Sequence, residues 1–199
     1  LPVDLYLIVF IVKGNNFDIV DGDSTPVLTD DSDFGVVASA SETKTFTIYN
    51  ENCQTALNVS SISLSGINST EFSIANISLP YIVPTDGSVT FDVVFNPQSL
   101  GVKNATVVIN NDDANESVYD FAVRAEFLCG TETSSWDGSV WSNGVPSKIT
   151  AVTFTGNYSS SSDLEACSVT ITNNAQVTIN SGDTFIVDGD VTVVAGSSL

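Results

Sequence analysis

Short runs of alternating apolar and polar residues, separated by turn-forming residues, are the feature that most constrains the fold of this chain. In the runs 45–49 and 89–95 every second residue is apolar, which places the phenylalanines on one face of an extended strand. Alternation at a period of two is typical of strands that pack one face against a core. The pattern predicts strands at 35–39, 43–50, 56–65, 71–75, 88–95, 103–110 and 118–127. Successive short strands of this kind indicate a β-sandwich.

The composition agrees with an all-β protein. Val, Ile, Thr, Ser, Asn and Gly dominate the sequence, whereas strong helix formers are scarce. An apolar content of 42% excludes a disordered chain. The length of 199 residues allows one large or two small domains, with enough material for a core in each.

The negative net charge and the absence of histidine exclude several classes of function. The net charge is −19 with only five basic residues, so we expect no nucleic-acid partner and no adsorption to anionic membranes. The chain contains no His, which excludes a Ser/His/Asp or Cys/His catalytic set within it. Paired carboxylates remain chemically possible, but they cluster in turn-like segments and no substrate-cleft motif accompanies them. We therefore expect a protein that is not an enzyme.

Residues 14–35 form an acidic segment that begins and ends with glycine and contains six aspartates. Its glycines and Pro26 predict a long ordered loop. Closely spaced carboxylates repel one another unless hydrogen bonds, solvent or a cation compensates them, and oxygen ligands alone suit Ca²⁺. The candidate calcium ligands are Asp21, Asp23, Asp30, Asp31 and Asp33. The alternative is that these aspartates cap turns through the backbone and face water.

A second acidic turn lies at 110–117. Its carboxylates belong to Asp112, Asp113 and Glu116, which either join a cation site or are solvated turn residues.

Five segments carry a resemblance to a known family. They are GNNFDIVDGDSTPVLTDDSDFG (14–35), TKTFTIYN (43–50), TFDVVFNP (90–97), ATVVINNDD (105–113) and YDFAVRAE (119–126). Together they resemble a "choice-of-anchor D" domain, which is similar to the Hydin-type (ASH) immunoglobulin-like sandwiches of secreted Bacteroidota surface proteins. The resemblance covers about residues 5–127. It implies an extracellular building block without known catalytic residues, exported by the type IX system.

The N-terminal run 3–12 is apolar on both faces apart from Asp4, which predicts a buried strand. It is too short to cross a membrane as a helix, so we expect no membrane insertion, and we expect any signal peptide to be gone already. Two roles remain open: pairing within its own sandwich, or strand addition to the sheet of a neighbouring subunit. The candidate subunit-interface residues are Val3, Leu5, Tyr6, Leu7, Ile8, Val9, Phe10 and Ile11.

The composition changes at residue 128, which predicts two domains, 1–127 and 128–199. The second contains both tryptophans, Trp136 and Trp141, among Gly, Asp, Ser and Asn residues. They form either a carbohydrate-stacking platform or a packed seal at the junction. The segments WDGSVWSNGVPS and DLEACSVTI (163–171) resemble a recurrent unit of Bacteroidota surface proteins, found ahead of repetitive β-structure.

Three cysteines are present, without the CxxC spacing of a zinc site. An exported protein with an odd count is expected to form one disulfide. We pair Cys129 with Cys167, because both lie in the second segment, and expect Cys53 to be a buried thiol. Three free buried cysteines are the alternative.

The segment from residue 168 to residue 193 contains a repeated pattern of short strands and turns. Short strands are expected at 168–171, 176–179, 184–187 and 190–193, six to eight residues apart and separated by turns such as NSGD and DGD. This spacing indicates stacked rungs of a β-solenoid or a small repetitive sheet. Such rungs cannot bury their faces alone, and the pattern stops in mid-repeat, so we expect a terminus that is cut or completed by another subunit.

These features together predict an extracellular structural protein at the cell surface. It would be a subunit of a filament, fibre or adhesin that assembles with copies of itself, or with neighbouring modules, by strand addition and end-to-end packing. Acidic loops, with or without Ca²⁺, would stiffen it. The alternative function is a carbohydrate-binding module of a larger secreted protein, with glycans as partners.

Overall fold

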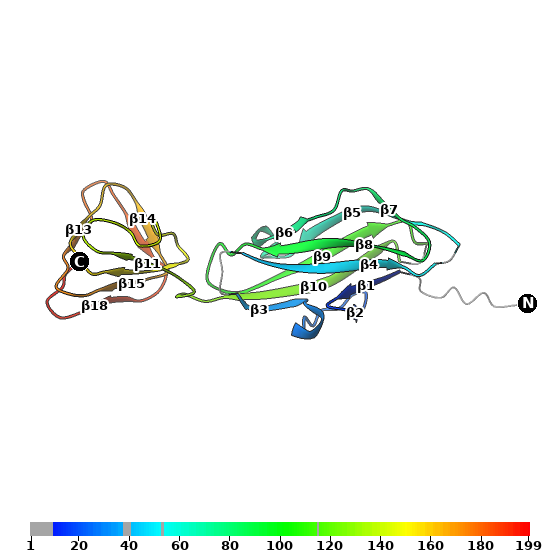
Figure 1. Cartoon of the computed structure of the whole chain (residues 1–199), viewed down its shortest axis with the longest axis horizontal. Helices are drawn as coiled ribbons and strands as arrows, with labels where there is room; N and C mark the ends of the chain where they lie inside the picture. The colour runs from blue at the N-terminus through cyan, green and yellow to red at the C-terminus, as the bar shows by residue number, and fades with distance from the viewer. Residues whose placement is uncertain (1–9, 38–40, 53, 115) are drawn as a thin grey trace, which may run out of the picture. The chain divides into compact units, whose positions relative to one another are not determined.

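A computed structural model describes residues 10–37, 41–52, 54–114 and 116–199 of the chain. Apart from two 3₁₀ turns, its regular elements are β-strands, which confirms the predicted all-β class (Figure 1). The chain divides into two compact units. The first comprises Leu1–Gly35, Ser41–Asn96 and Val102–Glu126, and the second comprises Val36–Ala40, Pro97–Gly101 and Phe127–Leu199. The assignment of 1–127 and 128–199 to separate folding domains stays a prediction.

The first unit is a sandwich of two five-stranded sheets. One sheet has the order β2 (Phe17–Ile19), β1 (Phe10–Gly14), β4 (Glu42–Asn50), β8 (Gly87–Phe95) and β6 (Phe72–Ala75). The other has the order β3 (Asp33–Val37), β10 (Val118–Phe127), β9 (Gly101–Asn111), β5 (Leu57–Ser65) and β7 (Tyr81–Val83). Figure 1 shows these sheets as two layers.

Aromatic side chains fill the core of the sandwich. Phe46 on β4 lies opposite Phe91 on β8, and their ring centroids are 5.7 Å apart. Phe46 also contacts Phe121 of the other sheet, at 5.2 Å between centroids. All three phenylalanines are fully buried, as is Phe95, so the alternation in β4 and β8 points its phenylalanines inward as predicted.

The predicted strands match the observed ones closely, with most ends within two residues. Residues 38 and 39 of the predicted strand 35–39 lie outside the described residues. The sequence reasoning missed β7, which is only three residues long and is followed directly by Pro84. It also missed the strands inside the acidic segment.

The acidic segment 14–35 is not the long loop that its glycines and proline predicted. It contains β2, a 3₁₀ turn η1 (Leu28–Asp30) and the start of β3. Asn15 and Asn16 both adopt positive φ, 47° and 66°, which is the backbone of a tight hairpin turn between β1 and β2. A Cβ on Gly14 would lie 1.8 Å from the carbonyl oxygen of Asp30, so only glycine fits where η1 crosses the hairpin.

The structure places the described part of the apolar N-terminal run in the sandwich of its own chain. Phe10 and Ile11 on β1 lie opposite Asn50 and Tyr49 on β4. Phe10 is 1% exposed and packs edge-on against Tyr119. This self-pairing corrects the assignment of Phe10 and Ile11 to a subunit interface. Val3, Leu5, Tyr6, Leu7, Ile8 and Val9 lie outside the described residues.

The second unit is a parallel β-solenoid. Its first sheet consists of β11 (Glu132–Trp136), β12 (Thr150–Phe154), β15 (Ser168–Ile171) and β18 (Val191–Val193), all parallel. Two smaller parallel pairs form the other sides: β13 (Tyr158–Ser159) with β16 (Val177–Thr178), and β14 (Leu164–Ala166) with β17 (Phe185–Val187). The chain passes through these sides in turn, so each coil has three sides.

This arrangement confirms the predicted solenoid and corrects its repeat. The strands that are six to eight residues apart are successive sides of one coil, not successive rungs. The stacked partners are farther apart in sequence: Phe154 lies opposite Ile171, and Val169 lies opposite Val191, 22 residues later. The solenoid core consists of Val152, Phe154, Ala166, Val169, Ile171, Ala175 and Val177.

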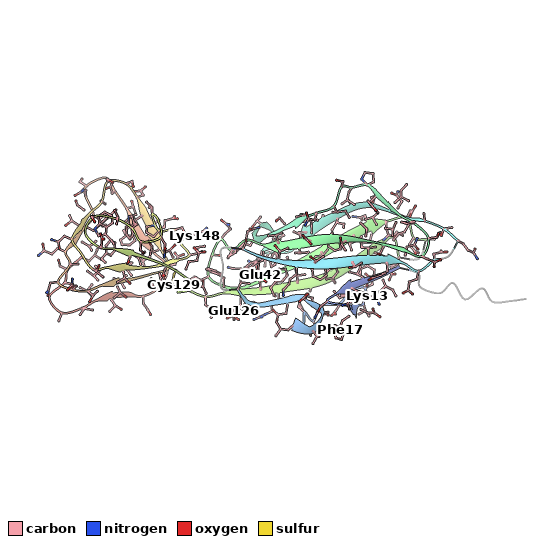
Figure 2. All side chains as sticks on the ribbon, viewed as in Figure 1. Lys13, Phe17, Glu42, Glu126, Cys129 and Lys148 are labelled. Atoms are coloured by element: carbon pink, nitrogen blue, oxygen red, sulfur yellow. A yellow bond between two sulfur atoms is a disulfide. The ribbon has the colours of Figure 1, made fainter. Side chains whose placement is uncertain are left out.

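A disulfide joins Cys129 to Cys167, as predicted. Cys129 lies two residues after the end of β10 (Figure 2), and the fully buried Cys167 lies between β14 and β15 of the solenoid. Cys53, the expected buried thiol, lies outside the described residues. No helix in the described part of the chain is long and apolar enough to span a membrane.

Candidate functional site

Three of the candidate calcium ligands close turns of their own segment. The Oδ1 atom of Asp23 accepts hydrogen bonds from the backbone N–H and the hydroxyl of Thr25, both at 2.8 Å. Asp30 accepts from the N–H of Ser32 at 2.9 Å and from its hydroxyl, and Asp33 accepts from the N–H of Gly35 at 2.8 Å. An aspartate that bonds a backbone N–H two residues later is the usual turn-forming arrangement.

Asp21, Asp31 and Asp33 have partners outside the segment. Asp31 pairs with Lys44 at 3.2 Å, and both oxygens of Asp33 accept from the guanidinium of Arg124. Asp21 accepts from the N–H of Asp120 at 2.8 Å. Both hydrogen bonds to Asp33 come from the same Nη1 atom, and Nη2 of Arg124 donates to Glu126 at 3.1 Å. The charge-assisted contact between Arg124 and Asp33 therefore links β10 to β3.

The turn hydrogen bonds of Asp23, Asp30 and Asp33 match the capping part of the sequence-based alternative, but Asp30 is 4% exposed and does not face water. Hydrogen bonds and cationic side chains supply the compensation that a closely spaced set of carboxylates requires. The described residues contain no group of three or more acidic or cysteine side chains arranged to hold a metal ion. The structure therefore does not bring the five aspartates together as one ligand set, and calcium binding stays a prediction.

The second acidic turn is held by one local hydrogen bond and one to another strand. Asp112 accepts from the N–H of Asn58 at 2.8 Å, and the side-chain oxygen of Asn111 accepts from the N–H of Asp113. Burial raises the pKa of Glu116, and the charges of Asp21 and Asp113 raise that pKa further. The two acidic segments thus come close enough to interact electrostatically.

The two tryptophans pack on each other and on the solenoid core. Their ring centroids are 5.3 Å apart, and Trp141 lies 5.5 Å from Phe154. Tyr158 contacts both indoles, and Nε1 of Trp136 donates to the carbonyl oxygen of Asn157 at 2.9 Å. Both tryptophans are half-buried, and these contacts are packing within the solenoid. A seal at the junction with the sandwich and carbohydrate binding both stay predictions.

The segment around Trp141 covers the first rung of the solenoid. The N–H of Ser142 donates to the carbonyl oxygen of Ser135 on β11, and the hydroxyl of Ser142 accepts from the N–H of Ser135. Trp136 and Trp141 form an antiparallel bridge. Side chains and backbone of this segment therefore protect the outer edge of β11, as a cap does in repeat proteins.

The last rung has no equivalent cover among the described residues. Val191 and Val193 on β18 lie opposite Val169 and Ile171 on β15, which are 1% and 0% exposed. Strand partners in register point to the same face of a sheet, so Val191 and Val193 occupy core-facing positions. They are nevertheless 47% and 45% exposed, and β18 is the edge strand of its sheet (Figure 1). β18 is the last strand of the described residues, and its outer edge has no strand partner among them.

Sequence reasoning expected that the rungs would need a further cover, but it could not locate the uncovered positions. They depend on the parallel register between β15 and β18, which joins residues 22 apart. Nothing in the sequence marks Val191 and Val193 as exposed, because a buried valine and an exposed valine are the same residue in the sequence.

No family model and no curated protein matches this chain. Among solved structures, the similar chains include a protein of unknown function from Porphyromonas gingivalis W83, at 16% identity over 47% of this chain and 42% of that one, with a TM-score of 0.41. The ASH/PapD-like domain 7 of human CEP192 is 10% identical over 60% of this chain and 84% of that domain, with a TM-score of 0.33. WR4, an MSP family member from C. elegans, is 13% identical over 50% of this chain and 94% of that one, with a TM-score of 0.34.

The similar bacterial chains also include the secreted serine protease VesC from Vibrio cholerae, at 19% identity over 49% of this chain and 22% of that one, with a TM-score of 0.40. This chain spans less than half the length of the Porphyromonas and Vibrio proteins. At these identities and TM-scores the similarities carry no information on function. The β-sandwich is of the immunoglobulin-like class, and membership of the choice-of-anchor D family stays a prediction.

Proposed function

We propose that this chain is a non-catalytic structural module of an extracellular surface filament, fibre or adhesin. The observation that carries the proposal is the combination of a β-sandwich with a parallel solenoid that contains the Cys129–Cys167 disulfide. Stacked rungs of a solenoid form an extended, rigid structure, which suits a building block.

Two further observations support this proposal. The Cys129–Cys167 disulfide suits an oxidising compartment outside the cytosol. The acidic segments are held by internal hydrogen bonds and ion pairs, and the chain has no histidine to serve as a general base. These features favour a rigid spacer over a catalyst.

The N-terminal run supplies the proposed joint. Residues 3–9 are apolar apart from Asp4. Strand addition of residues 3–9 to the sheet of a neighbouring copy would link modules into a filament.

Negative-stain electron microscopy and light scattering of the purified chain test this assembly. The intact chain is expected to form multimers or filaments, whereas a chain lacking residues 1–9 is expected to stay a folded monomer. The full-length variant Leu5→Asp/Leu7→Asp is the matched control for chain length and should behave like the truncated one. An intact chain that stays monomeric at every concentration, with residues 3–9 protected from proteolysis, would contradict the proposal.

A further inference from the structure

The disulfide closes a large covalent loop at the start of the solenoid. Cys129 lies between the end of β10 and the start of β11, and Cys167 lies directly before β15. The two cysteines are separated by 38 positions in the sequence. Residues 130–166, which include β11, β12, β13 and β14, are therefore bypassed by a much shorter covalent route from β10 to β15.

The first coil and its cap lie within this loop. Trp136 and Trp141 contact each other and Tyr158, with ring centroids 5.2 to 5.7 Å apart. The hydroxyl of Ser134 donates to the carbonyl oxygen of Gly144 at 2.8 Å. Both partners of each of these contacts lie between positions 130 and 166. The bypassed part of the chain is therefore held together by contacts of its own.

The two covalent routes enter the solenoid at different strands. Along the backbone, the first strand after Cys129 is β11, an edge strand that pairs with β12 alone among the described strands. Through the disulfide, the first strand after Cys167 is β15, which lies between β12 and β18. An edge strand is released by breaking its hydrogen bonds to one neighbour, whereas an internal strand must lose hydrogen bonds on both sides.

Hydrogen bonds hold both sides of β15 close to the disulfide. The N–H of Cys167 itself donates to the carbonyl oxygen of Thr150 on β12 at 2.9 Å. On the other side, the N–H of Val169 donates to the carbonyl oxygen of Asp190, directly before β18, at 2.9 Å. Cys167 is fully buried, whereas Cys129 is exposed. A force on Cys129 therefore reaches a buried strand that is anchored to both of its neighbours.

We propose that the Cys129–Cys167 disulfide is a load-bearing link, through which tension along the chain passes from β10 to β15 and bypasses the first coil with its tryptophan cap. The inference rests on the proposed function only for the origin of the tension, since a module of a fibre or adhesin is pulled along its chain. The load path itself follows from the covalent connection and from the order of strands in the sheet.

Single-molecule force spectroscopy of the intact chain, held by peptide tags at its two ends, tests this load path. The unmodified protein is compared with the variant Cys129→Ser/Cys167→Ser. Unfolding of the solenoid should lengthen the unmodified protein by about 130 Å less than the variant, because each of the 38 steps between the cysteines extends by at most ~3.5 Å. The length gain of the sandwich should be equal in both proteins and is the internal control.

The two proteins should also differ in lifetime under force. At the same force, the solenoid of the unmodified protein should survive about ten-fold longer, because hydrogen bonds on two sides of β15 must break instead of those on one side of β11.

A dithiol reductant provides a comparison that does not depend on the folding of a variant. Added to the folded, unmodified protein, it should produce the length gain and the lifetime of the double variant. The exchange converts the protein disulfide to two thiols, while the dithiol is oxidised to its own disulfide. Cys53→Ser is the matched control, because it removes a cysteine outside the pair and should leave both values unchanged.

Two results would overturn the inference. Equal length gains with and without the disulfide would mean that residues 130–166 carry the load in both proteins. A lifetime under force that does not change on reduction would mean that loading β15 gives no advantage over loading β11. Both measurements use single chains, so a failure of the chain to form multimers contradicts the proposed filament and not the load path.

Discussion

The sandwich and the solenoid of this chain bury their cores in different ways. In the sandwich, two sheets cover each other, and Phe46, Phe91 and Phe121 are fully buried between them. In the solenoid, each rung is covered by the rungs before and after it, so core positions lose their cover at an end. The first rung has the Trp141 segment, whereas Val191 and Val193 on the last rung remain half exposed. A sandwich is closed by its own sheets, but a solenoid needs a cap at each end.

The edge strands of the two units also differ in how well they are protected from association with other chains. In the sandwich, the edge strands β2, β3, β6 and β7 are three to five residues long, which limits the unpaired backbone they offer to other chains. In the solenoid, the edge strand β18 is equally short, but its two core-facing side chains are apolar and exposed. The length of an edge strand alone therefore does not distinguish a protected edge from one that promotes association with other chains.

The largest effect is expected from the disulfide, which should stabilise the solenoid and leave the sandwich unchanged. Cys129→Ser opens a cross-link between residues separated by 38 positions and should lower the free energy of unfolding of the solenoid by about 3 kcal/mol, mainly through the entropy of the unfolded chain. Both tryptophans lie in the solenoid, so tryptophan fluorescence during urea unfolding reports this unit alone. A reductant acting on the unmodified protein should reproduce the shift, and an unchanged midpoint would contradict the prediction.

A matched pair of valines tests the difference between covered and uncovered rungs. Val169→Ala removes a side chain that is 1% exposed and should cost about 2 kcal/mol of solenoid stability. Val191→Ala, at the paired position on the last rung, removes a side chain that is 47% exposed and should cost less than about 1 kcal/mol. Equal losses, measured by the same fluorescence assay, would mean that the last rung is covered in solution.

The smallest effect is expected at Glu116, in the second acidic turn of the sandwich. Burial, followed by the charges of Asp21 and Asp113, raises its pKa above the ordinary value of 4.5. A raised carboxyl pKa means that the folded state binds the proton more tightly than the unfolded state. The stabilisation is therefore complete below pH 4.5 and is lost as the pH rises through the folded-state pKa.

Glu116→Gln should accordingly be more stable than the unmodified protein at neutral pH and similar to it at acidic pH, as measured by the thermal midpoint. Asp21→Asn keeps the oxygen that accepts from Asp120 but removes a charge, so it should lower the pKa of Glu116 in an NMR titration. A pKa unchanged by Asp21→Asn would show that the two segments do not interact.

Much of the fold could be predicted from the sequence because strand alternation is a local property. The phenylalanines of β4 and β8 identify their core face without reference to any other strand. Strand β7 was missed because three residues are too few to show a period. The hairpin at Asn15 and Asn16 was missed because Gly14 and Pro26 predicted a loop, whereas two residues with positive φ reverse the chain within the segment.

The candidate site was less predictable, because it depends on contacts between residues far apart in the chain. The partners of Asp33 illustrate this: Gly35 lies two positions away and follows from turn chemistry, but Arg124 lies 91 positions away. The same holds for the solenoid, whose short strands were recognised while their spacing was assigned to the wrong repeat. Strands on successive sides of one coil are close in sequence and show a local pattern. Strands stacked in successive coils are 17 to 22 residues apart, and no local pattern connects them.

The sequence by itself determined the all-β class, the core-facing phenylalanines, the cysteine pair and the repetitive character of the second unit, since each follows from local pattern or composition. Only the tertiary structure decided which carboxylates are paired, how the tryptophans pack, and which valines lie uncovered on β18. The physical reason is that burial is a property of what lies above and below a residue. In a parallel solenoid that neighbour is a whole coil away, where no local pattern indicates it.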